Sequence, residues 1–92
     1  MAKVDIYTKA YCPFCTRAIA LLKHKLTRYP SLQINEINIG GDIALREKMI
    51  KRSHGNYTVP QIFINDIHIG GCDQLVAIEM NQQLDAMLAK SD

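Results

Sequence analysis

The chain has 92 residues, 48% of them hydrophobic and 22% charged, and its formal net charge is +2. That size and composition are ordinary for one soluble globular domain, residues 1–92, with a single modest core. So small a net charge gives no indication of a nucleic-acid partner, and no apolar run approaches the roughly 20 residues of a membrane span.

The N-terminus and the cysteine count indicate where the protein works. Met1-Ala2-Lys3-Val4-Asp5 leads straight into an alternating strand pattern, which is not a secretory signal. The three cysteines are an odd count and do not make a disulfide framework. We therefore expect a cytoplasmic protein, in which a Cys-x-x-Cys motif is redox-active or metal-binding.

The first predicted elements are a strand, a loop and a helix. Residues alternate from Lys3 to Tyr7 as in a strand, and a loop follows over 8–11. Pro13 is favoured at the first position of a helix, because its missing N–H would be unpaired there anyway. The helix is expected to end near Thr27. Its apolar stripe consists of Cys15, Ala18, Ile19, Leu22 and Leu26.

A second strand and a second helix follow. The run from Gln33 to Ile39 predicts a strand, and its imperfect alternation indicates a bulge or a frayed start. Gly40-Gly41 predicts a turn, and Asp42 is a good N-cap for the next helix. That helix has an apolar side formed by Leu45, Met49 and Ile50. Lys51 and Arg52 lie on its charged side, where they either face solvent or contact an anionic substrate.

The chain ends in a predicted hairpin and a last helix. Two strands, Gln61 to Ile64 and Ile67 to Ile69, are joined by Asn65-Asp66, which suits a two-residue turn because both residues tolerate positive φ. After Gly70-Gly71, Asp73 is expected to cap the last helix. The inward residues of that helix are Leu75, Ile78, Leu84, Met87 and Leu88.

These elements predict an α/β fold in the order β-α-β-α-β-β-α. The first two strands are joined by a helix, so we expect them to be parallel with a right-handed crossover. The last two strands form an antiparallel hairpin. The expected architecture is a four-stranded mixed sheet with helices on both faces.

The candidate active centre is Cys12-Pro13-Phe14-Cys15, on the turn from the first strand to the first helix. Cys12 lies just outside the helix N-terminus, where unpaired N–H groups and the helix dipole stabilise a thiolate, and Cys15 lies in the first turn. A thiolate attacks a disulfide to form a mixed disulfide, which a second thiol two residues away then attacks efficiently. Cys12 is therefore the candidate nucleophile, and Lys9 is close enough in sequence to add positive charge.

Zinc binding is the other interpretation of a Cys-x-x-Cys motif. The chain has no second pair of this kind, and Cys72 with one histidine is a poor set of ligands, so we expect no metal. We interpret Cys72 as a passive, partly buried thiol, because the redox cycle is complete without it. His24, His54 and His68 lie outside every motif and are interpreted as ordinary surface or strand residues.

Three motifs, in order and spread over nearly the whole chain, resemble those of glutaredoxins, most closely the small bacterial dithiol type. They are Tyr7-Thr8-Lys9 with Cys12-Pro13-Phe14-Cys15, then Thr58-Val59-Pro60-Gln61-Ile62-Phe63-Ile64, then Gly70-Gly71-Cys72-Asp73. Two positions depart from the usual pattern. Phe14 stands where tyrosine is usual. The glycine pair is commonly followed by two acidic residues or Ser-Asp, whereas this chain has Asp73 and then Gln74.

The resemblance implies a thioredoxin-like fold and glutathione-linked reduction of disulfides. It implies a cis Val59-Pro60 peptide beside the cysteines and a glutathione site formed by Lys9, Phe14, Thr58, Val59, Pro60, Gly71, Asp73 and Gln74. The cysteine of glutathione is expected at Val59, one carboxylate near Lys9, and the other at the start of the last helix. Glutathione is the expected electron donor, restored indirectly by glutathione reductase and NADPH, and no cofactor is expected to stay bound permanently.

Three functions from different classes remain open. The first is a monomeric dithiol enzyme that reduces protein disulfides and glutathionylated proteins. The second is a dimer in which Cys12 and glutathione hold an iron–sulfur cluster, although the stiffening effect of Pro13 argues against it. The third is a thioredoxin-type general reductase. The absence of tryptophan before Cys12, together with Lys9 and Gly70-Gly71, favours glutathione over that third function.

Overall fold

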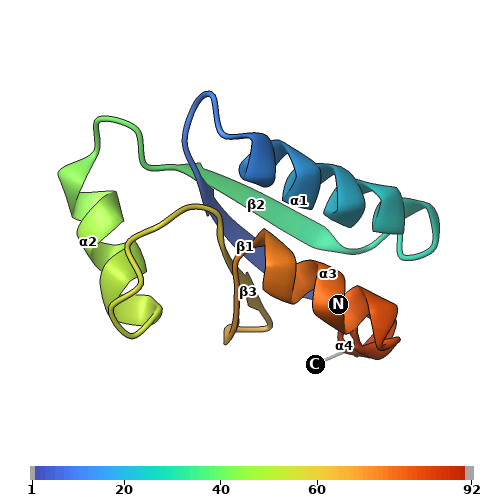
Figure 1. The fold of residues 1–92 in the computed structure, drawn as a ribbon. Coiled ribbons are helices and arrows are strands. Elements are labelled where there is room, and N and C mark those ends of the chain that lie inside the picture. The colour runs from blue at the N-terminus through green and yellow to red at the C-terminus, as the bar shows by residue number, and fades with distance from the viewer. Residues whose placement is uncertain (1, 91–92) are drawn as a thin grey trace.

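A computed structural model describes residues 2–90, and its central element is the strand β1 (Lys3–Thr8). The four strands of the sheet lie in the order β2-β1-β3-β4 (Figure 1). β2 (Gln33–Asn38) runs parallel to β1, whereas β3 (Gln61–Ile64) is antiparallel to β1, and β4 (Ile67–Gly70) is antiparallel to β3. The predicted mixed sheet and the order of its strands along the chain are confirmed.

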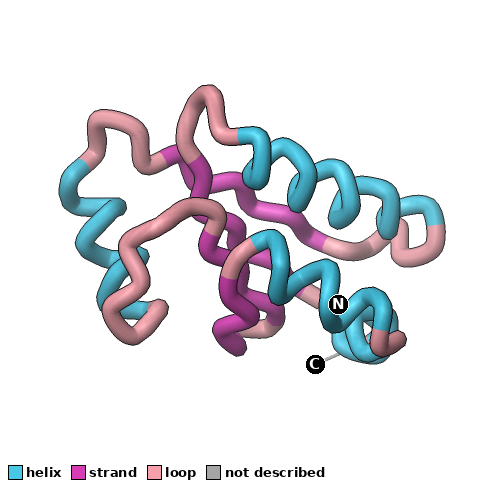
Figure 2. The backbone as a smooth tube through the Cα atoms, in the orientation of Figure 1, coloured by secondary structure: helices cyan, strands magenta, loops and turns pink. Residues whose placement is uncertain are grey.

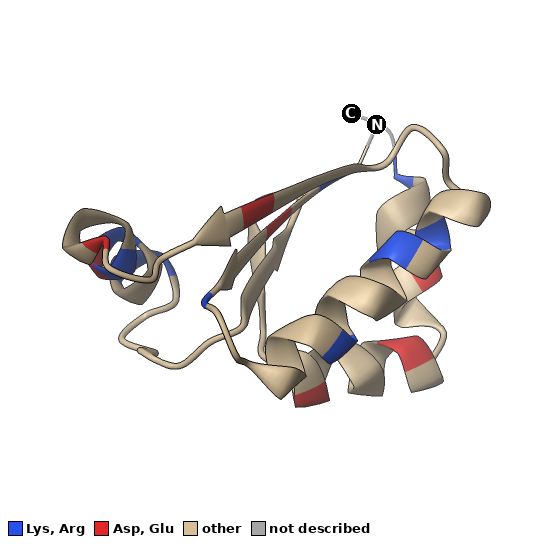
Figure 3. Cartoon of the chain, turned by 90° about the horizontal axis from the view of Figure 1, so that it is seen from above, with Lys and Arg blue, Asp and Glu red and all other residues tan. Residues whose placement is uncertain are grey.

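The helices cover both faces of this sheet. They are α1 (Pro13–His24), extended by the 3-10 turn η1 (Lys25–Thr27), then α2 (Ile43–Arg52), α3 (Cys72–Met80) and α4 (Gln83–Ala89). α2 lies alone on one face, and α1, α3 and α4 lie on the other, which makes the sheet the middle layer (Figure 3). Within residues 2–90, no helix has both the length and the apolar character needed to cross a membrane.

Strand alternation divides the core into two clusters. On the face of α1, α3 and α4, the cluster includes Val4, Ile6, Ile62 and Ile64, all fully buried. Tyr7 and Phe63 point to the opposite face and pack with Met49 of α2, the two rings 5.8 Å apart in an edge-to-face contact. Full burial of an apolar side chain of this size contributes about 1.5–3 kcal/mol, so both faces stabilise the fold.

The described sheet has neither the bulge nor the frayed start that were the two expectations for the second strand. β2 pairs with β1 without interruption from Lys3 opposite Gln33 to Thr8 opposite Asn38, and the one register shift of the described sheet lies between β3 and β4, at Ile62/Phe63. The alternation of β2 is imperfect for another reason: β2 is an edge strand, so neither of its faces is fully buried. The predicted hairpin turn is confirmed, since Asn65 and Asp66 both have positive φ.

The single last helix predicted from the sequence is wrong, because two helices occupy that segment. Gln82, with φ of 62°, separates α3 from α4. A continuous helix turns by about 100° per residue, so Leu75 and Leu84, nine positions apart, would face opposite sides. Both leucines are fully buried in the same cluster. The left-handed residue between the helices allows both side chains to face the sheet.

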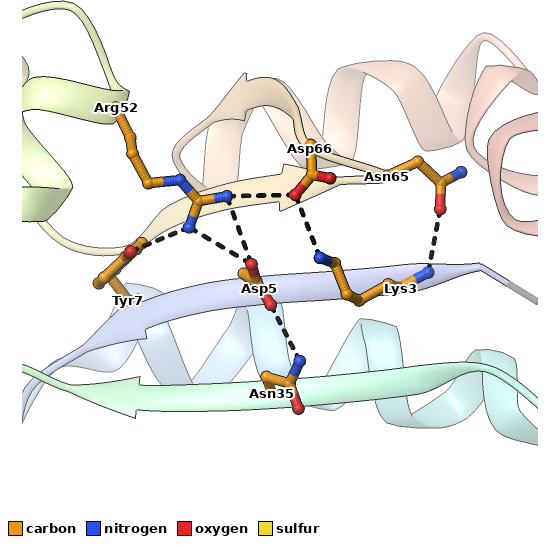
Figure 4. Close-up of polar contacts among 7 residues, drawn as sticks. All are labelled: Lys3, Asp5, Tyr7, Asn35, Arg52, Asn65 and Asp66. Carbon is orange, nitrogen blue, oxygen red and sulfur yellow. Dashed lines mark hydrogen bonds and ion pairs between the residues drawn. The ribbon is translucent and has the colours of Figure 1, made fainter.

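Arg52 neither faces solvent freely nor stands ready for a substrate, so both interpretations of this residue are wrong. Its guanidinium lies 2.9 Å from the Tyr7 hydroxyl and 3.3 Å from the Asp5 carboxylate (Figure 4). The same guanidinium lies 4.0 Å from the centroid of the Phe63 ring. The side chain is 24% exposed. Arg52 therefore anchors the end of α2 to the sheet, and its charge is matched by Asp5.

Lys25, in η1, joins the two C-terminal helices to α1. Its Nζ lies 2.7 Å from Glu79 of α3 and 2.9 Å from Asp85 of α4, and its side chain is 11% exposed. The hydrogen bond from the Lys25 ammonium holds the pKa of Asp85 below its usual range. One cation thus bridges two carboxylates that would otherwise repel each other.

We expect Lys25→Met to lower the free energy of unfolding at neutral pH by about 1–3 kcal/mol, because the Glu79 carboxylate loses the Lys25 ammonium and Asp85 is left with its longer pair to the exposed Arg28, at 3.4 Å. The pKa of Asp85 is depressed from 3.8 in the folded state, so this stabilisation is present above that value and is lost as pH falls through the folded value. Urea unfolding near pH 7 and near pH 2.5 measures both effects.

Lys23→Met is the matched control for this substitution. Lys23 pairs with Glu36 at 3.5 Å, but its side chain is 56% exposed. Such a surface pair contributes about 0–1 kcal/mol, so the control should unfold nearly as the wild type does. Equal losses for the two variants, or a Lys25→Met loss that does not shrink in acid, would contradict the assigned role of Lys25.

Candidate active site

The sheet topology brings three distant segments together at one end. β1 and β2 are parallel, so the loops that follow them lie at the same end of the sheet (Figure 2). β3 starts there too, because Tyr7 near the end of β1 pairs with Gln61 at the start of β3. β4 ends there, with Gly70 opposite Ile62. The cysteine loop, the segment before Gln61 and the segment after Gly70 are therefore neighbours.

Cys12 caps the N-terminus of α1. Its Sγ accepts a hydrogen bond from the Cys15 backbone N–H at 3.2 Å, and Pro13 is the first residue of the helix. The predicted placement of both cysteines is confirmed. The Cys12 sulfur thus receives a backbone N–H and lies at the positive end of the helix dipole.

Cys15 differs from Cys12 in its surroundings. Its side chain is buried, with 3% of its surface exposed, whereas Cys12 is half-buried. Burial, followed by the hydrogen bond with the Cys12 side chain, raises the pKa of Cys15 to about 12. Cys15 is therefore protonated at neutral pH, and of the two thiols only Cys12 is placed to attack an external disulfide.

Val59 lies directly beside the nucleophile. The Cys12 Sγ is 3.8 Å from the Val59 carbonyl oxygen, across 47 positions of sequence. The Val59-Pro60 peptide is cis, as the resemblance implied. The 3.8 Å distance makes the Val59 backbone and the Cys12 sulfur direct neighbours.

A groove of about 330 Å³ leads from Val59 to the start of α3. Seven of the predicted glutathione-site residues line it together with Cys72: Phe14, Thr58, Val59, Pro60, Gly71, Asp73 and Gln74. Phe14 is 53% exposed, as expected for a ring that faces a substrate. Residues from α1, from the segment before β3 and from α3 thus form one continuous surface.

Lys9 and Cys12 line a second hollow, of about 400 Å³. The two hollows share Thr58 and Val59. Sequence reasoning missed several residues of this second hollow, namely Tyr11, Ile39, Arg46 and Tyr57. Tyr11 is fully exposed and Tyr57 is 65% exposed. Each tyrosine directly precedes a motif, Tyr11 before Cys12 and Tyr57 before Thr58, and this placement of an aromatic residue is the signal that could have identified them. The sequence gives no signal for Arg46, because a basic residue on the polar side of a helix usually faces solvent and not a binding site.

Gln74 sets the start of α3. Its Oε1 accepts a hydrogen bond from the Gly71 N–H at 2.8 Å, so that Gly71 is the N-cap and the helix begins at Cys72. The prediction of Asp73 as N-cap is therefore wrong. Asp73 lies within the first turn, where its negative charge interacts favourably with the helix dipole.

The model of the family described as Glutaredoxin matches residues 4–69 of the chain. The chain belongs to the glutaredoxin family. It is 52% identical over 88 residues to glutaredoxin 3 of Escherichia coli (strain K12), a match that covers 96% of this chain and 99% of that protein. The resemblance inferred from the three motifs is thus confirmed, and the protein is a thiol-disulfide oxidoreductase.

Solved glutaredoxin structures share its thioredoxin-like fold. The solution structure of glutaredoxin from Brucella melitensis has a TM-score of 0.76 at 45% identity, covering 96% of this chain and 89% of that one. The crystal structure of a buckwheat glutaredoxin–glutathione complex has a TM-score of 0.78 at 26% identity, covering 92% of this chain and 74% of that one.

Cys72, the third cysteine of this glutaredoxin, lies in the groove wall at the first position of α3. It is 4% exposed, and burial raises the pKa of its thiol. Both properties are those of an inert thiol. Across residues 2–90, no three His, Cys, Asp or Glu side chains are grouped closely enough to hold a metal ion.

Proposed function

We propose that this glutaredoxin is a glutathione-dependent dithiol reductase of protein disulfides and of glutathionylated proteins, acting in the cytoplasm as a monomer. The observation that carries the proposal is the position of Cys12. Its sulfur lies beside Val59, at the junction of the groove and the hollow that contains Lys9, while Cys15 is buried behind it.

With a protein disulfide, both cysteines take part. The Cys12 thiolate attacks one sulfur, forming a Cys12–substrate disulfide and releasing the other substrate sulfur as a thiolate. Cys15 then attacks the Cys12 sulfur, its proton passes to the departing substrate sulfur, and a Cys12–Cys15 disulfide remains. Two molecules of glutathione reduce this disulfide and become glutathione disulfide. Glutathione reductase and NADPH then return the two electrons.

With a glutathionylated protein, Cys12 alone is sufficient. Its thiolate attacks the glutathione sulfur, and the protein leaves as a free thiol. A second glutathione thiolate then attacks the glutathione sulfur of the Cys12 adduct, so that glutathione disulfide leaves and Cys12 is regenerated. The same residue is therefore the nucleophile in both reactions.

The two hollows suit the two ends of glutathione. The cysteine of the tripeptide would pair with the Val59 backbone, and one carboxylate would meet the Lys9 ammonium. The other carboxylate would lie at the N-terminus of α3, whose first N–H groups have no partner within the helix. In support, the related buckwheat glutaredoxin has been crystallised as a glutathione complex.

An assay coupled to glutathione reductase and NADPH tests this proposal. We expect saturable NADPH oxidation with glutathione and its mixed disulfide with 2-mercaptoethanol. A parallel assay coupled to thioredoxin reductase should show little activity. The opposite result, turnover with thioredoxin reductase alone, would identify a general disulfide reductase.

Gln74→Glu should improve glutathione binding. The carboxylate is isosteric with the amide, so it can still accept the Gly71 N–H, and it adds a negative charge near the ammonium of the γ-glutamyl end. An exposed ion pair contributes about 0.2–1 kcal/mol, so we expect KM for the mixed disulfide to fall by up to about five-fold at low salt. High salt should reduce this gain, because it screens the pair.

Gln83→Glu is the control for Gln74→Glu. Gln83 is exposed at the start of α4, so its substitution adds the same charge away from the groove. Steady-state kinetics at two ionic strengths compare the variants. An equal change in KM for both would mean that net charge, and not a contact with glutathione, causes the effect.

A further inference from the structure

We propose that Gln61 and His68 are positioning residues that make the Thr58 hydroxyl a hydrogen-bond donor to the groove. This position of the groove would then select an acceptor atom, a carbonyl or carboxylate oxygen of the bound thiol peptide. The inference rests on the proposed function, because it assigns one contact within the same binding site.

A chain of two hydrogen bonds leads from the sheet to the groove. The His68 Nε2 lies 2.7 Å from the Gln61 Oε1, and the Gln61 Nε2 lies 3.3 Å from the Thr58 Oγ1. Gln61 is 3% exposed, so water has little access to its amide. Thr58, by contrast, is exposed and lines both the groove and the hollow that contains Lys9.

The chemistry of each group determines the direction of this chain. The Gln61 Oε1 carries no hydrogen, so His68 must donate through Nε2–H. The Gln61 amide nitrogen is a donor only, so the Thr58 oxygen must accept from it. Thr58 has a single hydroxyl hydrogen, and this hydrogen remains available to a ligand in the groove. An acceptor atom next to Thr58 completes the chain, whereas a donor atom would lack a partner.

Packing holds His68 in the required orientation. Its ring lies on the Phe63 ring, with centroids 5.0 Å apart and planes at 33°, and Phe63 is 2% exposed. Burial, followed by the nearby His54, lowers the pKa of His68. A neutral ring has only one N–H, and the short contact to Gln61 places it on Nε2. His68, interpreted from the sequence as an ordinary strand residue, is thus the fixed end of the chain.

A double-mutant cycle on KM for the glutathione mixed disulfide tests this role. Thr58→Val removes the hydroxyl with little change of shape, and Gln61→Leu removes the amide that orients it. We expect each variant to raise KM by about two- to ten-fold with kcat nearly unchanged, since one hydrogen bond to the substrate is lost. The double variant should be no worse than Thr58→Val alone. If the rise in KM of the double variant equals the product of the two single rises, the two residues act independently and the inference is overturned.

Variants of the two histidines separate positioning from a general effect on stability. His68→Leu should raise KM as Gln61→Leu does, and His68→Gln, which keeps a donor close to the Nε2 position, should restore it. His54→Asn is the control, because His54 contacts the His68 ring but belongs to no hydrogen bond of the chain. An effect of His54→Asn as large as that of His68→Leu would overturn the inference.

A measurement without glutathione keeps this inference separate from the proposed function. Nitrogen-15 NMR of the reduced protein reports which His68 nitrogen carries the proton. The Nε2–H form supports the inference, and the Nδ1–H form overturns it, whatever the kinetics. Absence of turnover by the wild type would instead overturn the proposed function. If the wild type turns over the substrate and Gln61→Leu has the same KM as the wild type, the inference is overturned and the proposed function stands.

Discussion

Cys12→Ser is expected to abolish both reduction of protein disulfides and turnover of glutathione mixed disulfides. Thiolate is the nucleophile in disulfide exchange, and a serine hydroxyl does not supply an equivalent anion at neutral pH. Loss of a nucleophile typically lowers turnover by about 10³-fold or more. NADPH-coupled assays with both substrates should therefore fall to the uncatalysed rate.

Alkylation checks the same assignment in the unmodified protein. At pH 6, iodoacetamide followed by peptide mass spectrometry should find Cys12 modified first. Cys15 is buried and its pKa is raised to about 12, so almost none of it is thiolate at pH 6. Modification of Cys15 before Cys12, or wild-type activity in Cys12→Ser, would show that the nucleophile has been assigned to the wrong cysteine.

Cys15→Ser is expected to separate the two activities. Glutathione in solution can attack the Cys12–glutathione adduct, so turnover of glutathione mixed disulfides should stay within about three-fold of wild type. Reduction of a protein disulfide needs an internal thiol to release the substrate, so that activity should fall by about 10²-fold or more, given the high effective concentration of a neighbouring thiol. Insulin reduction by glutathione measures the second activity.

Cys72→Ser is the matched control for Cys15→Ser. Cys72 is almost as buried as Cys15, and burial raises its pKa too, but it lies in α3 and not in the dithiol turn. Both activities should be kept. If protein-disulfide reduction survives in Cys15→Ser and disappears in Cys15→Ser/Cys72→Ser, Cys72 is the internal thiol instead.

The dithiol turn was predictable because its signals are local. Pro13 at the first helical position and the apolar stripe behind it place Cys12 at the N-cap and Cys15 in the first turn, as the structure has them. The Asn65-Asp66 hairpin was predictable for the same reason, since positive φ is a property of the turn residues themselves. Neither prediction needs knowledge of a distant partner.

The errors concern residues whose partners are far away in sequence or whose role depends on packing. Arg52 has an ordinary place on a charged helix face, and only the packing of α2 on the sheet brings it over Phe63. The break at Gln82 has no glycine or proline signal, and it follows from the need to bury Leu75 and Leu84 on one side. Asp73 is a good capping residue, but Gln74 binds Gly71 and starts the helix earlier.

By itself, the sequence determined the order of the strands and of the first two helices, the dithiol turn and, through the resemblance of its motifs, the family. The elements and the turn depend on backbone preferences and periodicity within a few residues, and these act whatever the distant parts of the chain do. The family was inferred from the resemblance of three motifs. Only the tertiary structure decided that β1 lies between β2 and β3, which brings Val59 within 3.8 Å of Cys12 and places the Gly71 turn beside the same groove. It also decided that His68 reaches Thr58 through Gln61. Each strand pairs where its apolar side chains are buried on both faces of the sheet. No local sequence pattern specifies which strands become neighbours in this way.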